Sequence, residues 1–388
     1  MPAVADPVTD WMEFAAAVED AARTPDAPFD ATAYSGGTRT ALAMFEAADA
    51  VDRKYQSWLK VPVAAVGASG PAAIAAAAHD VLWASYTSQR AVIDDRFALA
   101  MAELPVGRSR DDGITVGKLA AAAALQAGGL DPSARLTPYW PSTAPGVWVA
   151  TTPTVLDPHY AAMKPWFLTS AAQFRPGPPV ALGSPLWLKD VDEVRRMGGK
   201  ASTERSASDT VLARFWAPYD TAPALHAVAA QPGRTLVQNA RFYAAEAMVG
   251  DDIGIALVEA KLHYGFWRPI TAIRAGGGNP QIKADPMWEP LLKTPMHPEY
   301  PCGHCVGAAA IAAVIDAEGP VPAGGLPFSN SKMPGFVVTV PTTADYVRQV
   351  SFSRICAGVH YRSTAEVSEA MARKIAAYAL AKFAPPLN

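Results

Sequence analysis

Apolar residues recur at helical spacing over the first third of the chain. Within residues 9–23, Thr9 suits an N-cap and the apolar positions share one helical face: Trp11, Phe14, Ala15 and Val18. Further helical patterns, one of them long enough for two helices, cover 36–58, 71–104 and 111–129. We therefore predict five helices before residue 130, the last ending at a Gly-Gly pair.

Proline interrupts this pattern between about residues 130 and 200. Segments such as PYWPSTAPGVW and FRPGPPVALGSPLW are dense in proline, which removes backbone donors and fixes φ. The tryptophan and phenylalanine side chains among them favour burial. We expect a long, ordered crossover held by aromatic packing, rather than a flexible linker or an apolar substrate site.

Helical patterns then return and strand patterns stay scarce. The helical segments are 192–199, 206–220, 234–267, 303–319 and 364–384, and the best strand candidate is FVVTV at 336–340. These patterns predict an all-α protein made of two packed helical bundles. Its parts are an N-terminal bundle, a Pro/aromatic-rich crossover and a C-terminal bundle, over 8–130, 131–204 and 205–388.

Composition narrows the classes of partner. The formal net charge is −3, from 33 basic and 36 acidic residues, so no basic surface for nucleic acid is indicated. No apolar run approaches the length of a bilayer span, which predicts no membrane partner. The N-terminus lacks a complete signal peptide, although Ala3-Val4-Ala5 resembles the end of one. Localisation is therefore open between the cytoplasm and export with a signal peptide removed.

Three charged stretches stand out in the last third, and KLHYGFWRP at 261–269 is the first. Lys261 and Arg268 are two helical turns apart, which predicts that both project from one helical face before Pro269 ends or bends the helix. Two cations without nearby carboxylates repel each other, and an anion between them would remove that cost. The alternative is a solvated basic face, but three flanking aromatic residues favour burial.

The second stretch is HPEYPCGHC at 297–305. Its prolines keep the backbone extended up to Cys302, Gly303 allows a sharp turn, and a helix is predicted to begin near His304. A helix N-terminus presents free N–H groups and the positive end of the helix dipole. This stretch therefore suits a phosphate-like anion.

The third stretch is SRICAGVHYR at 353–362. Arg354 and His360 are six residues apart, which is not one helical face, so we predict that the helix ends near Gly358 and leaves His360 on a turn. Ser363 and Glu366 have the spacing of a capping box for the last helix. For either histidine, a hydrogen-bonded core residue is the plain alternative to a catalytic one.

Together the stretches supply the chemistry of an oxyanion site. Lys261, Arg268 and Arg354 are permanent cations, and the predicted helix start adds backbone donors. One histidine could attack phosphorus or coordinate a metal oxyanion, and the other could act as an acid/base.

The three motifs, in order, resemble the signature of a known superfamily. K-x6-RP, P-x-GH and SR-x5-H are similar to the motifs of type 2 phosphatidic acid phosphatases and vanadium-dependent haloperoxidases. TRTALAMFEAADAV, the PGVW turn, FRPGPP, SDTVLARFW and FWRPITAIR also look like the soluble haloperoxidase branch, over most of residues 8–385. The resemblance implies two helical bundles around one oxyanion pocket.

The resemblance also implies a role for each motif residue. The oxyanion's oxygens would be bound by Lys261, Arg268, Cys302, Arg354 and the N–H of Gly303. His304 would be the acid/base at the apical oxygen. His360 would ligate vanadium in a haloperoxidase or form a phosphohistidine in a phosphatase. His297 would tune halide and peroxide handling, with a surface histidine as the alternative.

Cys302 departs from the family pattern, which usually has serine there. A thiol is a weaker donor, and it is oxidisable beside peroxide, which favours phosphatase activity. The whole-chain resemblance favours a vanadate-dependent haloperoxidase, with vanadate as cofactor, phosphate as a competing ligand and a small-molecule substrate. The alternatives are a metal-independent acid phosphatase and an inactive oxyanion-binding homologue. A homo-oligomer is left open.

The cysteines and a pair of aspartates have competing interpretations. The three cations would repel zinc, and a redox CxxC lacks its βαβ context. A disulfide from Cys302 or Cys305 to Cys356 fits an exported protein; otherwise buried free thiols are favoured for Cys305 and Cys356. For Asp251 and Asp252 we favour helix-surface charge or pairing with an arginine over acid/base chemistry.

Overall fold

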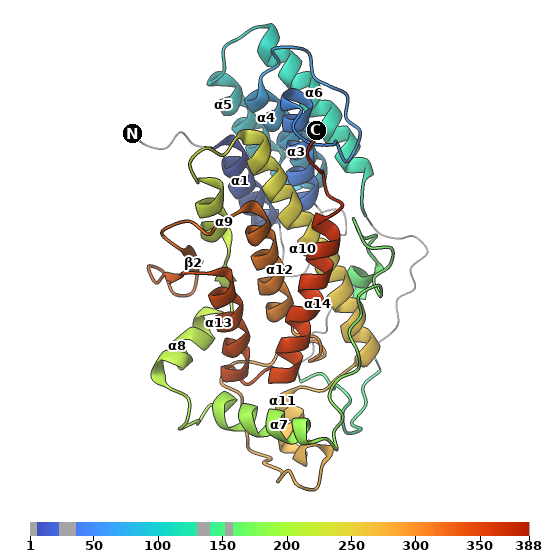
Figure 1. Cartoon of the computed structure of the whole chain (residues 1–388), viewed down its shortest axis with the longest axis vertical. Helices are drawn as coiled ribbons and strands as arrows, with labels where there is room; N and C mark the ends of the chain where they lie inside the picture. Colours follow the sequence, from blue (N-terminus) through green and yellow to red (C-terminus); the bar gives the residue numbers. More distant parts are fainter. Residues whose placement is uncertain (1–5, 23–35, 130–139, 152–157, 388) are drawn as a thin grey trace.

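The computed structural model describes residues 6–22, 36–129, 140–151 and 158–387. Helices dominate these residues, which confirms the all-α class. The N-terminal helices gather at one end of the molecule (Figure 1): α1 (Pro7–Ala22), α3 (Gly36–Asp52), α4 (Gly70–Ser85), the short η1 (Thr87–Gln89), α5 (Arg90–Ala102) and α6 (Arg108–Gln126).

Small residues let three of these helices pack closely. An alanine-rich cluster joins α3, α4 and α6, and it includes Ala47, Ala77 and Ala120. A Cβ atom at Gly113 of α6 would collide with the carbonyl of Ser69, the N-cap of α4, and one at Gly117 with the carbonyl of Ala73 in α4. Glycine is therefore required on this face of α6, because only a bare backbone allows such an approach.

Most of the later elements form the lower part of Figure 1, and one long helix connects them to the N-terminal helices, beside which the C-terminal end also lies. Its helices are η2 (Pro158–Ala162), α7 (Pro185–Gly198), α8 (Ala207–Phe215), α9 (Ala222–Ala229), α10 (Leu236–Tyr264), α11 (Pro269–Arg274), η3 (Gly276–Gly278), α12 (Gly303–Glu318), α13 (Thr343–Cys356) and α14 (Arg362–Leu380). A small antiparallel sheet, in the order β1-β2-β3, joins Tyr219–Asp220, Leu326–Asn330 and Val338–Val340. The predicted strand at 336–340 is thus formed over its last three residues.

Helix α10 runs through both helical regions. A capping box of Thr235 and Gln238 starts it, and it packs against α3 at one end and α12 and α14 along its length. One continuous apolar core contains side chains from both regions, for example Phe45, Val249 and Ile375. The division into three parts at residues 130 and 204 stays a prediction.

Two buried carboxylates hold the crossover against α10. Asp252 accepts the backbone N–H groups of Trp166, Phe167 and Leu168 at 2.6, 2.9 and 3.0 Å, and Asp251 accepts the Trp166 indole N–H at 2.8 Å. Both aspartates are buried, so the interpretation as helix-surface charge was wrong. Their partners lie some 85 residues away in sequence, which local spacing does not encode.

Two local predictions near the motifs were also wrong. Helix α10 ends at Tyr264, with Gly265 in a left-handed conformation at φ 51°, so Lys261 and Arg268 do not share a helical face. Pro269 begins α11, with Arg268 as its extended N-cap. The hydroxyl of Ser363 donates to Asp190 instead of capping α14, and Tyr361 occupies the N-cap.

The predicted end of the preceding helix is formed. Helix α13 ends at Cys356, and Gly358 has a φ of 77°, so His360 lies on a turn between α13 and α14. A Cβ atom at Gly358 would collide with the carbonyl of Gly198, so this turn needs glycine for space as well as for φ. Among the helices of the described ranges, none has the length and apolar character of a membrane span.

Candidate oxyanion-binding site

The structure brings the three motifs together. Lys261 lies in the last turn of α10, and Arg268 is the N-cap of α11. Gly303 and His304 begin α12. Arg354 lies in the last turn of α13, and His360 lies on the turn before α14. Hydrogen bonds join Arg268 to both His297 and His360. The roles of these residues toward a ligand stay predictions.

Lys261 is buried and anchors the proline-rich loop before α12. Its Nζ donates to the carbonyls of Pro298 and Glu299, at 2.7 and 3.2 Å, and to that of Pro301. Burial and the neighbouring Arg268 hold the pKa of Lys261 well below its ordinary value. The side chain thus fixes the backbone that leads into the helix start.

Arg268 is fully buried and connects the second and third motifs. Its Nε and Nη2 donate to the carbonyl and the Nδ1 of His297, at 3.0 and 2.9 Å. Its Nη1 donates to the carbonyl of Val359 at 2.8 Å and to Nε2 of His360 at 3.0 Å. Burial lowers the pKa of Arg268 to about 9.

Arg354 differs from the other two cations because part of its guanidinium has no protein partner. It is 3% exposed, and its Nε and Nη1 have no hydrogen-bond acceptor within the described ranges. Burial lowers its pKa to about 10. Buried charged donors without acceptors are costly, so this side chain has the features of an anion ligand.

The start of α12 offers further donors. Cys302 is the N-cap, and its own N–H donates to Ser368 Oγ at 2.8 Å. The N–H of Cys305 points to Cys302 Sγ at 3.2 Å. No acceptor in the described part of the chain takes the N–H groups of Gly303 and His304, which are therefore available to an anion.

Cys302 and Cys305 form a disulfide, with Cα atoms 5.4 Å apart. Cys356 is a buried free thiol in a different apolar cluster. A disulfide to Cys356 and a free thiol at Cys305 were therefore wrong: the N-cap and third residue of a helix lie over each other, within bonding reach. In the disulfide, Cys302 has no S–H proton to donate to an oxyanion.

His360 is held neutral with a defined tautomer. An arginine can only donate, so the Nε2 that faces Arg268 carries the lone pair and Nδ1 carries the proton. Nδ1 lies 2.8 Å from Oε1 of Glu299, which accepts that proton. Burial, then Arg268, Lys261 and Arg354, keep the pKa of His360 well below its ordinary value.

The other two histidines are neutral for similar reasons. His304 Nε2 lies 2.8 Å from the carbonyl of Ala217, and burial, followed by Arg354, lowers its pKa to about 3. His297 is partly buried against Arg268, and burial, followed by Lys261 and Arg268, lowers its pKa to about 2. His297 thus touches the site rather than lying free on the surface.

Glu299 is the site residue that the sequence interpretation missed. It is fully buried, and its carboxylate accepts from His360 Nδ1, the Tyr361 N–H at 3.1 Å and the Thr364 hydroxyl at 2.9 Å. Burial raises its pKa to about 7, against the opposing effect of Arg268. The available signal was a lone acidic residue between two prolines inside HPEYPCGHC.

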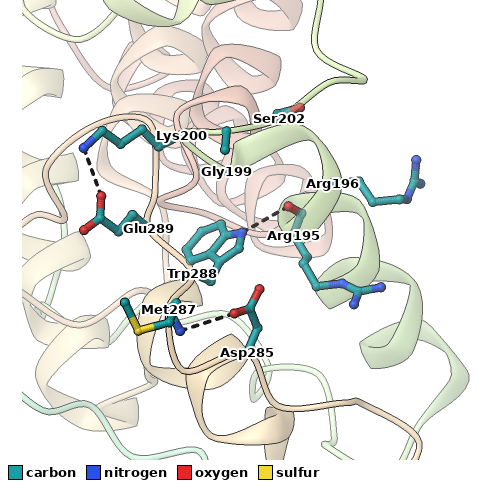
Figure 2. Close-up of a pocket in the computed structure, with 10 residues that line it drawn as sticks. Arg195, Arg196, Gly199, Lys200, Ser202, Asp285, Met287, Trp288 and Glu289 are labelled. Carbon is teal, nitrogen blue, oxygen red and sulfur yellow. Dashed lines mark hydrogen bonds and ion pairs between the residues drawn. The ribbon is translucent and has the colours of Figure 1, made fainter.

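A surface pocket of about 610 Å³ lies apart from these residues, between the end of α7 and residues 285–289 (Figure 2). Its cations are matched by carboxylates: Lys200 pairs with Glu289 at 3.0 Å and Arg195 with Asp192 at 3.1 Å. This pocket therefore lacks the unmatched positive charge of the motif site.

The helical-bundle fold of this protein is similar to that of vanadium-dependent haloperoxidases. Residues 241–388, which contain all three motifs, match the family model of the VCPO second helical-bundle domain. The resemblance predicted from the motifs is therefore confirmed. No curated protein matches the chain.

Solved structures extend the similarity to nearly the whole chain. A bacterial vanadium-dependent iodoperoxidase is 20% identical with a TM-score of 0.75, over 97% of this chain and 95% of that one. A bacterial vanadium-dependent chloroperoxidase is 17% identical in its holo form, with a TM-score of 0.67 over 93% and 94%. Its apo form is 18% identical, with the same TM-score over 92% and 94%. At these identities the likeness shows the fold.

Proposed function

We propose that this protein is a vanadate-dependent haloperoxidase-like enzyme that oxidises halide with hydrogen peroxide at His360. The observation that carries the proposal is a neutral histidine, with its lone pair on Nε2, that lies among three buried basic side chains. The two unpartnered guanidinium nitrogens of Arg354 support it further, because they suit the oxygens of a tetrahedral anion.

The residues fit vanadate in number and in kind. His360 Nε2 would be the ligand atom, and Arg268 Nη1, which donates to that nitrogen in this structure, would donate to an oxygen of the anion instead. Arg354 and the Gly303 N–H would donate to the remaining oxygens, and Lys261, whose Nζ donates to three carbonyls in this structure, would act through its charge. Bound vanadate would supply Lewis acidity that activates peroxide without a change of metal oxidation state. Phosphate would compete for the same donors.

His304 would hold and return the proton of the peroxide. Its Nε2–H donates to Ala217, so the Nδ1 lone pair is the atom available to accept a proton. The low pKa of His304, about 3, reflects burial and the nearby cations. A bound anion would offset those cations and so raise that pKa toward the range useful for acid/base chemistry.

The disulfide bears on the choice between peroxidase and phosphatase. A free thiol at position 302 would be oxidised beside peroxide, whereas a cysteine already in a disulfide has no thiolate to oxidise. The disulfide therefore answers the objection from thiol oxidation, while the hydrogen-bond donor expected at position 302 is absent. Acid phosphatase activity stays the second candidate, because the same Nε2 lone pair of His360 could attack phosphorus.

One preparation assayed in two ways tests the proposal. We expect oxidation of iodide or bromide by hydrogen peroxide that depends on added vanadate and is lost in His360→Ala. The parallel assay is hydrolysis of an aryl phosphate without vanadate. Phosphate turnover that needs His360, with no vanadate-dependent halide oxidation, would establish the phosphatase instead. Activity in neither assay would favour the inactive oxyanion-binding homologue.

A further inference from the structure

The carboxylate of Glu299 is placed to control the direction of the His360 ring. Among the described residues, the donors that reach it come from one short segment: His360 Nδ1, the Tyr361 backbone and the Thr364 hydroxyl. It is fully buried, so no water competes for these bonds. Glu299 is therefore joined to the imidazole nitrogen opposite the one that would bind the anion.

The donor on one side of the His360 ring and the acceptor on the other side allow one tautomer. Arg268 donates to Nε2, so a neutral ring must carry its proton on Nδ1, and the group facing Nδ1 must be an acceptor. An ionised carboxylate is a pure acceptor. A water or a hydroxyl could serve either tautomer, whereas Glu299 and Arg268 together select one.

We propose that Glu299 is a positioning residue that fixes the Nδ1–H tautomer and the orientation of His360, and so directs the Nε2 lone pair at the oxyanion. The inference rests on the proposed function in that it takes His360 as the ligand of the anion. A carboxylate bonded to Nδ1–H also makes Nε2 a stronger donor to a metal centre.

Glu299 has a second effect through charge. Its carboxylate opposes the lowering of the Lys261 and Arg268 pKa values, so it lies close enough to act on both cations. With Glu299 ionised, one negative charge partly offsets the three cations of the site. Loss of the Glu299 charge alone would strengthen the attraction of the site for any anion. Loss of Glu299 as the acceptor for His360 Nδ1–H would weaken only a bond between His360 Nε2 and the ligand.

A purely structural role is the competing explanation. Glu299 accepts the N–H of Tyr361, the N-cap of α14, and the hydroxyl of Thr364 in the first turn of that helix. Its removal could therefore loosen the start of α14. Such loosening would weaken vanadate and phosphate binding together, whereas a positioning role affects vanadate, which bonds to Nε2, more than phosphate held by charge.

The test compares Glu299→Leu, which removes the acceptor, with Glu299→Gln, which keeps an acceptor oxygen without the charge. Thr364→Val removes one bond to the carboxylate and leaves the contact with His360. Glu289→Gln is a matched surface control, since Glu289 is 55% exposed. The measurements are ¹⁵N shifts of the imidazole nitrogens, assigned with His360→Ala, and titrations with orthovanadate and with inorganic phosphate, after circular dichroism has verified folding.

We expect His360 of the unaltered protein to carry its proton on Nδ1, and Glu299→Gln to keep that tautomer. In Glu299→Leu the buried Nδ1–H loses its acceptor, which opposes the preference set by Arg268, so mixed tautomers are expected. The ratio of vanadate to phosphate affinity should fall by roughly 10–100-fold, the range for loss of a second partner of a metal-bound histidine. Glu299→Gln, Thr364→Val and Glu289→Gln should change that ratio by less than about threefold, an effect of under 1 kcal/mol.

A proton on Nε2 in the unaltered protein would overturn the proposal. So would equal losses of vanadate and phosphate affinity in Glu299→Leu, or no loss in either. If Glu299→Leu does not fold, the tautomers of the unaltered protein and of Glu299→Gln decide. None of these measurements needs turnover, so an absence of halide oxidation would count against the proposed function and not against the role of Glu299.

Discussion

We expect Arg354 to lower the stability of the protein when no anion is bound, and to contribute to binding when an anion is present. Its guanidinium is 3% exposed, and two of its nitrogens have no acceptor in the described part of the chain. Replacement by methionine keeps an unbranched side chain and removes the charge. We predict that Arg354→Met is more stable than the unaltered protein in buffer without vanadate or phosphate, and that it no longer binds vanadate tightly.

The magnitude follows from the pKa of Arg354, which burial lowers from 12.5 to about 10. A lowered pKa for a cation means that folding disfavours the charged form, at every pH below the folded value. A shift of about 2.5 units corresponds to roughly 3 kcal/mol, so a gain of about 1–3 kcal/mol is expected after imperfect packing of methionine. Loss of two charge-assisted hydrogen bonds should weaken vanadate binding by roughly 100-fold or more.

Urea denaturation with and without orthovanadate measures both effects. At a vanadate concentration 100 times its dissociation constant, the unaltered protein should gain about 2.7 kcal/mol by linkage, and Arg354→Met should gain almost nothing. Arg348→Met on the same helix is the control, because Arg348 is 73% exposed and paired with Asp345. A loss of more than 1 kcal/mol in Arg354→Met without vanadate would refute this reasoning.

Three other predictions concern the crossover, the disulfide and pH. Asp252→Ala should lower the free energy of unfolding by about 3 kcal/mol or more, because three buried N–H groups lose their acceptor. Asp252→Asn should lower it by less. A change under about 0.5 kcal/mol for Asp252→Ala in urea denaturation would contradict this. Cys302→Ser combined with Cys305→Ala should raise vanadate-dependent bromide oxidation several-fold, since serine supplies a hydroxyl donor at position 302. Loss of the disulfide should lower the free energy of unfolding by about 2 kcal/mol. Unchanged turnover would mean that the hydroxyl donor does not limit the reaction. Burial raises the pKa of Asp251 to about 6, so its ionisation opposes folding above that pH and not below about pH 4. Asp251→Asn should therefore gain up to about 3 kcal/mol more at pH 8 than at pH 4, and equal effects at both pH values would disprove the cause.

The sequence by itself determined the helical class and predicted which residues form the candidate site. Apolar spacing is a local property, so the helices around Trp11, Ala77 and Val249 could be predicted from the chain. From the three motifs we predicted one site for Lys261, Arg268, Arg354 and two histidines, because an anion would offset the repulsion among such cations. The turn at Gly358 was also predictable, because glycine readily adopts a positive φ.

Only the tertiary structure decided which groups touch. Glu299 and His360 are 61 residues apart, and Asp252 meets its three donors across more than 80, so no periodicity connects them. The Cys302–Cys305 bond depends on the residue at which α12 starts. The motif HPEYPCGHC predicts that start only to within a residue or two. Lys261 and Arg268 still lie close together, although not on one helical face, because Gly265 ends α10 and the chain turns before α11 begins. Local spacing sets the conformation of short segments, whereas burial and unmatched charge, which arise only on packing, select the partners.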